Sequence, residues 1–333
     1  MSEDGGVPAA QTLCVDIGAS YVRVGLADGG RVVRMVERGI PDLLAQYPGD
    51  IVLAVTELMA EMRASSPDRE DAPSPIGVGV PAIVREDGSL RVGLSSGIPG
   101  GSTLRDRLSQ RFATEVFVDN DASLGALGEA IYGAGAGQRD LVLLTLGSNI
   151  GMGIVADGRI YRGARGGAGE IGTVPLRLGS HETARWEVVD ALRRTSPASS
   201  RPADGYVWLE ELYGGQALAS MWRLRAPGGT AEGSPGTPRV LPLAAAGDPV
   251  ARELVSQAID GWALAIATTS GILDPAMVLI GGGIAADIGP HLGPLRQAVE
   301  GLMPGRAPHV EIATLGPLAG LIGAAARARL AVG

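Results

Sequence analysis

The chain has 333 residues, more than one hydrophobic core usually serves, and this length suits two domains. Its formal net charge is −8 with no block of Lys and Arg, which argues against a nucleic-acid partner. The single cysteine, Cys14, excludes a disulfide framework and is expected to be a small buried residue. The acidic N-terminus has no signal-like apolar stretch, and no apolar run is long enough for a bilayer. We therefore expect a cytoplasmic protein without a membrane segment.

In the first part of the chain, short apolar runs alternate with amphipathic segments. Apolar runs bounded by turn residues predict strands, and a period near 3.6 predicts helices. The expected strands are Leu13–Val15, Tyr21–Ala27, Arg31–Val36, Ile76–Val80 and Val116–Val118, and the expected helices are Asp50–Met62, Leu104–Phe112 and Ala122–Tyr132.

The second part of the chain continues this alternation with longer helices. The expected strands are Leu141–Leu146, which opens a hairpin, and Met277–Ile280, and the expected helices are Leu209–Leu224, Pro249–Ile272 and Leu318–Leu330. Strands that alternate with helices predict layered α/β lobes.

Two short stretches look like copies of one device. One runs from Asp16 to an Asp28-Gly turn, and the other from Leu146 to an Asp157-Gly turn. Each leaves an apolar run, turns through small residues and returns through an alternating segment, which predicts a β-hairpin. Backbone N–H groups in such turns form anion-binding concavities. The repetition one domain apart indicates an internal duplication and a phosphoryl-transfer enzyme.

Polar residues at the two hairpin turns are candidates for holding a nucleotide. Asp16 is expected to hold Mg²⁺, mostly through water, although an Asp in this place could also cap a turn. Ser148 and Asn149 could add donors to phosphates, and Ser20 is a weaker candidate.

The string Asp119-Asn120-Asp121 ends a predicted strand and precedes a helix of small residues. Ligands of α/β sheets bind at this position, and transfer of phosphate to an alcohol needs a carboxylate that accepts the hydroxyl proton. The alternative is helix capping. We expect one of the three residues to cap the helix and one or two to face substrate.

Two glycine-dense segments offer further candidates. Glu170 is an isolated acid among glycines, suited to accept hydrogen bonds from sugar hydroxyls, or otherwise an exposed loop charge. Gly281, Gly282 and Gly283 follow a buried strand, where they permit either close approach of a nucleotide or a tight turn.

In this order, these segments resemble the ROK family of sugar kinases and related repressors. The strings that carry the resemblance are Asp16-Ile-Gly-Ala-Ser, Gly79-Val-Pro-Ala-Ile-Val84, Asn120-Asp-Ala-Ser-Leu-Gly-Ala-Leu-Gly-Glu129, Gly151-Met-Gly-Ile-Val, Gly169-Glu-Ile-Gly172, Ile280-Gly-Gly-Gly-Ile284 and Gly320-Leu-Ile-Gly-Ala-Ala325. The resemblance implies an actin-like, RNase-H-like α/β fold of two lobes with ATP and a sugar between them, and a homodimer.

The resemblance also implies a C-terminal helix that returns to the first lobe. The expected lobes are residues 1–121 with 318–333, and residues 122–317. In the phosphate turns the family has Gly-Gly-Thr and Gly-Thr-Gly, where this chain has Gly18-Ala-Ser20 and Gly147-Ser-Asn149, so both keep a hydroxyl.

Matched position by position, Asp121 corresponds to the family's catalytic base, Asn120 to its sugar-binding neighbour and Glu170 to a sugar-binding carboxylate. A further sugar-binding Glu is best matched by Glu210, with Glu187 as a second candidate.

Many family members carry a structural zinc ion held by one His and three Cys. Here Thr173 stands at the His position, and one cysteine cannot supply three thiolates, so no zinc site of that type is expected. The family's His also touches the sugar, which makes Thr173 a candidate substrate contact. The segment from Thr173 to Val207 must then be held by packing, and Trp208 suggests an apolar replacement for the metal.

Three functions follow from the resemblance. The first is an ATP- and Mg²⁺-dependent kinase of a hexose, hexosamine or cyclitol, with Asp121 as general base. The second is a sugar sensor without catalysis; its DNA-binding form is disfavoured because only 15 residues precede Asp16. The third is a kinase that takes phosphate from polyphosphate, which the acidic balance supports little.

Overall fold

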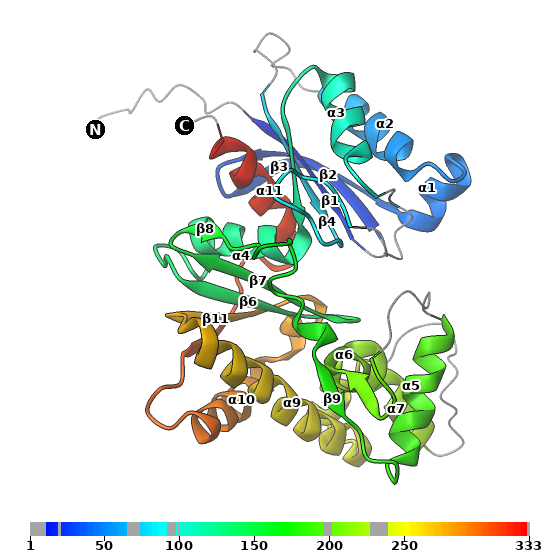
Figure 1. The fold of residues 1–333 in the computed structure, drawn as a ribbon, viewed down its shortest axis with the longest axis vertical. Helices are drawn as coiled ribbons and strands as arrows, with labels where there is room; N and C mark the ends of the chain where they lie inside the picture. The colour runs from blue at the N-terminus through cyan, green and yellow to red at the C-terminus, as the bar shows by residue number, and fades with distance from the viewer. Residues whose placement is uncertain are drawn as a thin grey trace. The chain divides into compact units, whose positions relative to one another are not determined.

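The computed structural model describes residues 11–18, 21–64, 74–91, 98, 100–195, 202–226 and 239–331, and the chain divides into two compact units. The first unit comprises residues 1–139, 153–168 and 317–333, and the second comprises residues 140–152 and 169–316. Figure 1 shows the helices and strands of each. The chain therefore passes more than once between the units.

A five-stranded mixed sheet forms the centre of the first unit. Three neighbouring strands of this sheet run parallel to one another, and its first two strands in the chain make the expected hairpin, with Gly18 N donating to Tyr21 O across the turn at 2.9 Å. The spatial order of its strands is β3 (Arg31–Gly39), β2 (Tyr21–Asp28), β1 (Thr12–Ile17), β4 (Ile76–Val80) and β5 (Val116–Asn120).

The second five-stranded sheet repeats this topology. Its spatial order is β8 (Arg159–Ile160), β7 (Ile150–Ala156), β6 (Leu141–Leu146), β11 (Met277–Gly281) and β12 (His309–Ile312). In both sheets the first three strands in chain order lie side by side as a meander. The fourth strand pairs in parallel with the other side of the first strand, and the fifth pairs in parallel with the fourth. The shared topology confirms the internal duplication that the two hairpins predicted.

Helices cover both faces of the first sheet. Leu13, Val15 and Ile17 of β1 point to one face, into a core shared with α1 (Ile40–Gln46), α2 (Ile51–Ala64) and α3 (Thr103–Phe112). Cys14, between them, points to the other face, where it packs with residues of α4 (Asp121–Tyr132) and α11 (Ala319–Arg329). This alternation follows the two-residue period of a strand. The prediction of a buried Cys14 is confirmed.

The C-terminal helix α11 packs unusually close to its neighbours in the first unit. A Cβ at Gly77 of β4 would lie 1.9 Å from the carbonyl oxygen of Ala324, and one at Gly323 would lie 1.8 Å from that of Leu124. Backbone cannot yield at these distances, so glycine is required at both positions. The expected C-terminal helix is therefore confirmed and is joined tightly to the first sheet and to α4.

Helix α9 (Pro249–Leu273) is the longest of the second unit. Its Asp248 cap accepts a hydrogen bond from Ala251 N at 2.7 Å, and its fully buried Trp262 donates to Tyr213 O at 3.1 Å. It packs against α7 (Gly215–Arg225), α8 (Val240–Ala245) and α10 (Gly289–Leu302). None of the helices in the described part of the chain combines the length and the apolarity that a membrane crossing requires.

The prediction of one helix over Leu209–Leu224 is wrong. The segment forms α6 (Leu209–Tyr213) and α7, which begins anew after Gly214. The break frees two N–H groups for bonds outside the helix: Gly215 N and Gln216 N donate to the carbonyl oxygens of Gly147 and Ser148 at 2.8 and 3.1 Å. A continuous helix would direct these N–H groups to its own previous turn.

The segment between Thr173 and Trp208 has a small apolar core of its own. It contains β9 (Pro175–Arg177), which pairs with β10 (Tyr206–Trp208), and helix α5 (Thr183–Thr195). Leu178, Val189 and Val207 are buried together, and the tryptophan packed against them is Trp186. Packing thus holds the described parts of this segment, although the expected Trp208 contributes its backbone to β10.

Candidate functional site

The carboxyl ends of three parallel strands bring acidic residues to one edge of the first sheet. Asp16 of β1 pairs with Gly79 of β4, and Gly79 pairs with Asp119 of β5. With neighbouring strands about 4.8 Å apart, Asp16 and the end of β5 lie roughly 10 Å apart at the backbone. This is the edge at which open α/β sheets bind ligands.

Asp16 is buried and lies within β1 rather than capping a turn. Its side chain points to the α11 face, where a Cβ on Gly320 would lie 3.0 Å from Oδ1. Arg23 Nη1 approaches Oδ2 at 3.4 Å. Burial raises the pKa of the Asp16 carboxyl, and Arg23 opposes this shift. A further cation at the carboxylate would offset the same desolvation.

Asn120 and Asp121 stand at the junction of β5 and α4. Asn120 caps the helix, because its Oδ1 accepts from Ser123 N at 3.0 Å, and its Nδ2 donates to Ala82 O at 3.3 Å. Asp121 is the first residue of the helix, where the helix dipole stabilises an anionic side chain, and its Oδ1 accepts from Ala122 N at 2.8 Å. The expectation that one of the three polar residues caps the helix is confirmed for Asn120.

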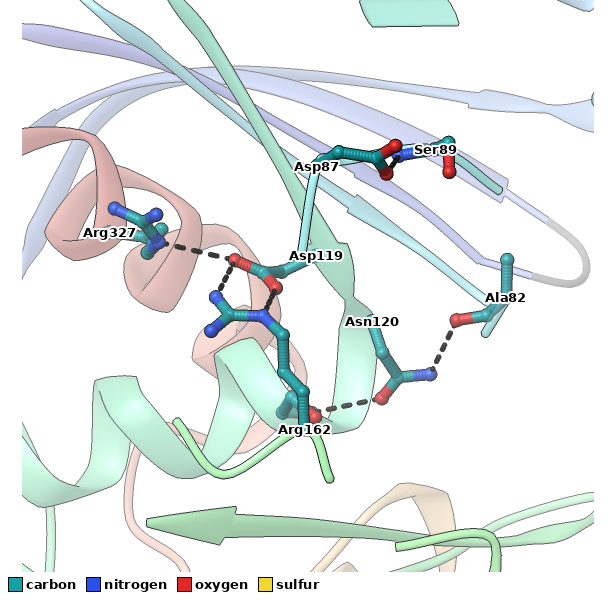
Figure 2. Close-up of polar contacts among 8 residues, drawn as sticks. Ala82, Asp87, Ser89, Asp119, Asn120, Arg162 and Arg327 are labelled. Atoms are coloured by element: carbon teal, nitrogen blue, oxygen red, sulfur yellow. Dashed lines mark hydrogen bonds and ion pairs between the residues drawn. The ribbon is translucent and has the colours of Figure 1, made fainter. Parts of the chain in front are cut away.

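Asp119 lies on the opposite face of the same strand end (Figure 2). Its side chain is only 3% exposed and accepts two hydrogen bonds from Arg162, Nε to Oδ1 at 2.6 Å and Nη2 to Oδ2 at 2.7 Å. Arg327 of α11 adds a contact of 3.3 Å from Nε to Oδ2. Asp119 is therefore held by guanidinium groups, which bind both of its carboxylate oxygens.

In the second unit, Glu170 and Glu210 form a pair of neighbouring carboxyl groups. Glu170 is exposed at the surface, and partial desolvation there raises the pKa of its carboxyl. Desolvation also raises the pKa of Glu210, the charge of Glu170 adds to the rise, and a hydrogen bond from Ile150 N at 3.4 Å opposes it. Glu187, the second candidate, is exposed on α5. The structure thus brings Glu170 and Glu210 together.

Thr173 ends a short 3₁₀ turn that begins after Glu170. Its hydroxyl donates to the carbonyl oxygen of Glu170 at 3.0 Å, and its N–H donates to the same atom at 3.2 Å. The exposed Thr173 side chain therefore holds the backbone that carries Glu170, and only its oxygen lone pairs stay available to a ligand.

The turn of the second hairpin joins β6 to β7 through Gly147, Ser148 and Asn149. Gly147 N donates to Asn149 O at 3.0 Å, which resembles the bond that closes the first turn, and the start of α7 holds the carbonyl groups of Gly147 and Ser148. The side chains of Ser148 and Asn149 are exposed. Ser20 of the first turn lies outside the described residues.

Gly281, Gly282 and Gly283 carry the chain from β11 into a 3₁₀ helix. Gly282 has a φ of +84°, and a Cβ there would lie 2.4 Å from Leu146 O, so backbone conformation and packing both require glycine. At Gly283 a Cβ would meet nothing within 4 Å. Packing explains Gly282, and Gly283 leaves its backbone accessible.

Sequence reasoning missed the arginines that surround the strand end. Arg23 is opposite Asp16 in the hairpin register, a pairing that the two predicted strands would have allowed us to foresee. Arg162 and Arg327 are far from Asp119 in the chain, and no local pattern indicates them. Within the described residues, no three His, Cys, Asp or Glu side chains cluster as metal ligands would.

Comparisons with known proteins agree with this architecture. The family model described as "ROK family" matches residues 12–330. Glucokinase of Thermotoga maritima is 30% identical over 96% of this chain and 97% of its own length, and N-acetyl-D-glucosamine kinase of Salmonella paratyphi A is 29% identical over 93% and 96%. The structure of a ROK family glucokinase from Streptomyces griseus, in complex with glucose and AMPPNP, has a TM-score of 0.71 at 25% identity and covers 96% of this chain and 100% of its own.

The chain belongs to the ROK family, as the motif order indicated. Its fold is the actin-like α/β fold that the resemblance implied, built from two sheets of one topology.

Proposed function

We propose that this protein is an ATP-dependent kinase that transfers the γ-phosphoryl group to a hydroxyl of a hexose or a hexose-like sugar or cyclitol. The observation that carries the proposal is Asp121, a carboxylate on the first turn of α4 at the ligand-binding edge of the first sheet. The glucokinase and N-acetylglucosamine kinase relatives support the class of reaction and leave the sugar open.

In the proposed reaction Asp121 accepts the proton of the sugar hydroxyl. A bond forms between the hydroxyl oxygen and the γ-phosphorus, and the bond from the γ-phosphorus to the β,γ-bridging oxygen breaks. ADP leaves with the electron pair of that bond, and the proton passes from Asp121 to solvent. Asn120 would orient a neighbouring hydroxyl through the hydrogen-bonding capacity that its capping role leaves free.

Glu170 and Glu210 would bind sugar hydroxyls as acceptors. Both carboxyls have raised pKa values from desolvation, so hydroxyl donors would stabilise charges that the protein itself compensates only partly. Thr173 would support Glu170 and offer its hydroxyl oxygen to the sugar.

The two hairpin turns would hold the phosphates of ATP. Gly18, Ser20, Gly147, Ser148 and Asn149 would contribute backbone N–H groups and side-chain donors. The accessible backbone of Gly283, with its neighbours Gly281 and Gly282, would pass beside the nucleoside.

Asp16 fits a magnesium ion that keeps most of its water, because the site offers one buried carboxylate and not a full set of protein oxygens. Mg²⁺ bound there would neutralise charge on the phosphates. The proposed enzyme is a homodimer. Light scattering measures its mass in solution, and a particle with the mass of one chain would contradict the dimer.

The test is ADP release from Mg·ATP with a panel of hexoses, hexosamines and cyclitols. For Asp121→Asn we expect kcat to fall by roughly 10²- to 10⁴-fold, the usual contribution of a general base, while sugar affinity stays close to that of the unchanged protein. Calorimetry with the same sugars measures the affinity.

Three results would contradict the proposal or a part of it. Equal losses of kcat and sugar affinity in Asp121→Asn would make Asp121 a ligand of the sugar and not the base. Absence of ADP release with every sugar, despite thermal stabilisation by one of them, would favour a sugar sensor. Release of phosphate only from polyphosphate would change the donor.

A further inference from the structure

The ion pairs of Asp119 with Arg162 and Arg327 form a cluster at the end of β5. None of these three side chains contacts a ligand in the proposed function. Successive strand residues point to opposite faces, so Asp119 and Asn120 leave β5 on opposite sides. Asp119 is bound by Arg162 on one side, and Asn120 is bound to Ala82 O and Ser123 N on the other. Figure 2 shows the contacts of Asp119 with Arg162 and of Asn120 with Ala82. The last two residues of β5 are thus held from both faces.

We propose that Arg162 is a positioning residue for the transfer reaction. Its two hydrogen bonds to Asp119 fix the junction of β5 and α4, where Asp121 is the first residue of the helix. The proposal rests on the function proposed above. Arg162 does not itself contact substrate in this proposal. It acts through Asp119, which is two residues from the proposed base.

The contact between Arg162 and Asp119 is of the kind that fixes orientation. Two parallel N–H···O bonds between a guanidinium and a carboxylate define a plane as well as a distance. Asp119 is nearly fully buried and the Arg162 side chain is 25% exposed, so water competes little. A shift of the strand end would break two charge-assisted bonds.

Arg327 supports the same carboxylate in a different way. Its single contact with Asp119 is longer, at 3.3 Å, and its guanidinium lies 4.5 Å from the ring centre of Phe117. Phe117 and Asp119 are two residues apart and share one face of β5. Arg327 thus packs along this face, and the directional bonds come from Arg162.

Arg162 also begins the segment that leads to Glu170. Its carbonyl oxygen accepts a hydrogen bond from Ala168 N at 3.0 Å, which closes the turn two residues before Glu170. One residue therefore anchors the start of the segment carrying a proposed sugar ligand and, through its side chain, the strand end carrying the proposed base.

A cavity beside the cluster provides a direct test. Its volume is about 370 Å³, and Asp119, Arg162 and Arg327 contribute to its lining. If the Arg162 side chain is shortened, a small planar cation from solution can reach Asp119.

The experiment compares Arg162→Lys and Arg162→Ala with a matched control, Arg107→Lys. Arg107 of α3 makes two similar hydrogen bonds to Asp50, at 2.9 and 3.0 Å, in the same unit and without a contact to Asp119. Lysine keeps the charge but loses the paired bonds. We expect kcat to fall roughly 10- to 100-fold in Arg162→Lys, because a displacement of the proposed base by up to about 1 Å has an effect of this size.

The split between kinetic constants distinguishes positioning from general damage. The KM for the sugar should change by less than about 3-fold in Arg162→Lys, because the interaction is needed in the transition state. Arg107→Lys should keep kcat within about 2-fold. Melting curves taken alongside report how far each variant is folded.

Chemical rescue completes the test. Methylguanidinium at millimolar concentration should raise the kcat of Arg162→Ala, since it restores a planar fork at Asp119. Methylurea, which has the same shape without the charge, should leave kcat low.

An unchanged kcat in folded Arg162→Lys, or losses of equal size in Arg162→Lys and Arg107→Lys, would overturn the proposal. So would a folded Arg162→Ala that methylguanidinium does not rescue. If Arg162→Ala does not fold, Arg162→Lys decides. Failure of the proposed function is distinct, because the unchanged protein would then release no sugar-dependent ADP.

Discussion

Asp119 in the first unit and the pair Glu170 and Glu210 in the second are stabilised in opposite ways. In the first unit, Asp119 is buried and bound by two arginines, Arg162 and Arg327. In the second, Glu170 and Glu210 have raised pKa values, and the charge of one adds to the shift of the other. The first arrangement supports rigid placement of a base, and the second supports binding of hydroxyl donors.

This difference follows from what a carboxylate needs when water is removed. A cation and hydrogen-bond donors within the protein stabilise the charge in every state, so the group stays where it is. A carboxylate with few hydrogen-bond donors from the protein raises the free energy of the free protein. It is stabilised most when a ligand supplies the donors. Substitutions in the two units should therefore change stability in opposite directions.

The largest effect is expected for Asp119→Asn in the first unit. Loss of this charge leaves two arginines without their partner, which should lower the free energy of unfolding by about 3 kcal/mol. Urea unfolding measures it. The control is Asp50→Asn, where the ion pair is about 39% exposed on both sides and Asn can still cap α2, so the loss should stay below about 1 kcal/mol. Equal losses would contradict the comparison.

In the second unit, Glu210→Gln should raise the melting temperature at neutral pH. A raised pKa means that folding opposes the charged form, and glutamine removes the charge while keeping the shape. The same change should weaken sugar binding by roughly 10-fold, since a charge-assisted hydrogen bond is lost. Differential scanning calorimetry and titration calorimetry measure the two. A lower melting temperature would show that the charge stabilises this unit.

The smallest effect concerns pH. As pH falls through the raised pKa values of Glu170 and Glu210, the folded protein takes up protons before the unfolded chain does, so the opposition of these groups to folding is relieved. Sugar affinity should decline over the same range of falling pH, because protonated carboxyls are weaker acceptors. Titrations across this range should show a flatter dependence in the double variant Glu170→Gln/Glu210→Gln. An unchanged dependence would assign it to other groups.

Local sequence patterns predicted much of the fold. The Asp16 and Leu146 stretches predicted two hairpins, and these hairpins open two sheets of identical strand order. Asp119-Asn120-Asp121 was placed at a strand end before a helix, as observed, because alternation and small-residue content are local signals.

What could not be predicted depends on contacts between distant segments. The helix expected over Leu209–Leu224 breaks at Gly214 because N–H groups of α7 bond the turn after β6, and only the Gly-Gly pair hinted at this. The bonds from Arg162 to Asp119 join residues 43 positions apart, and periodicity carries no information on such pairs. The roles of Asp121, Glu170 and Glu210 stay predictions that the experiments above address.

The place of helix α11 has a consequence for synthesis of the chain on the ribosome. The helix lies beside α4 over Cys14 and packs on Gly77, so the layer on this face of β1 and β4 is incomplete until residues 319–329 are made. The second unit lies between in the sequence, so its residues are all translated before the first unit can be completed. The strands made first thus keep part of one apolar face uncovered until residues 319–329 are translated, and exposed apolar surface of this kind promotes aggregation or binding to chaperones.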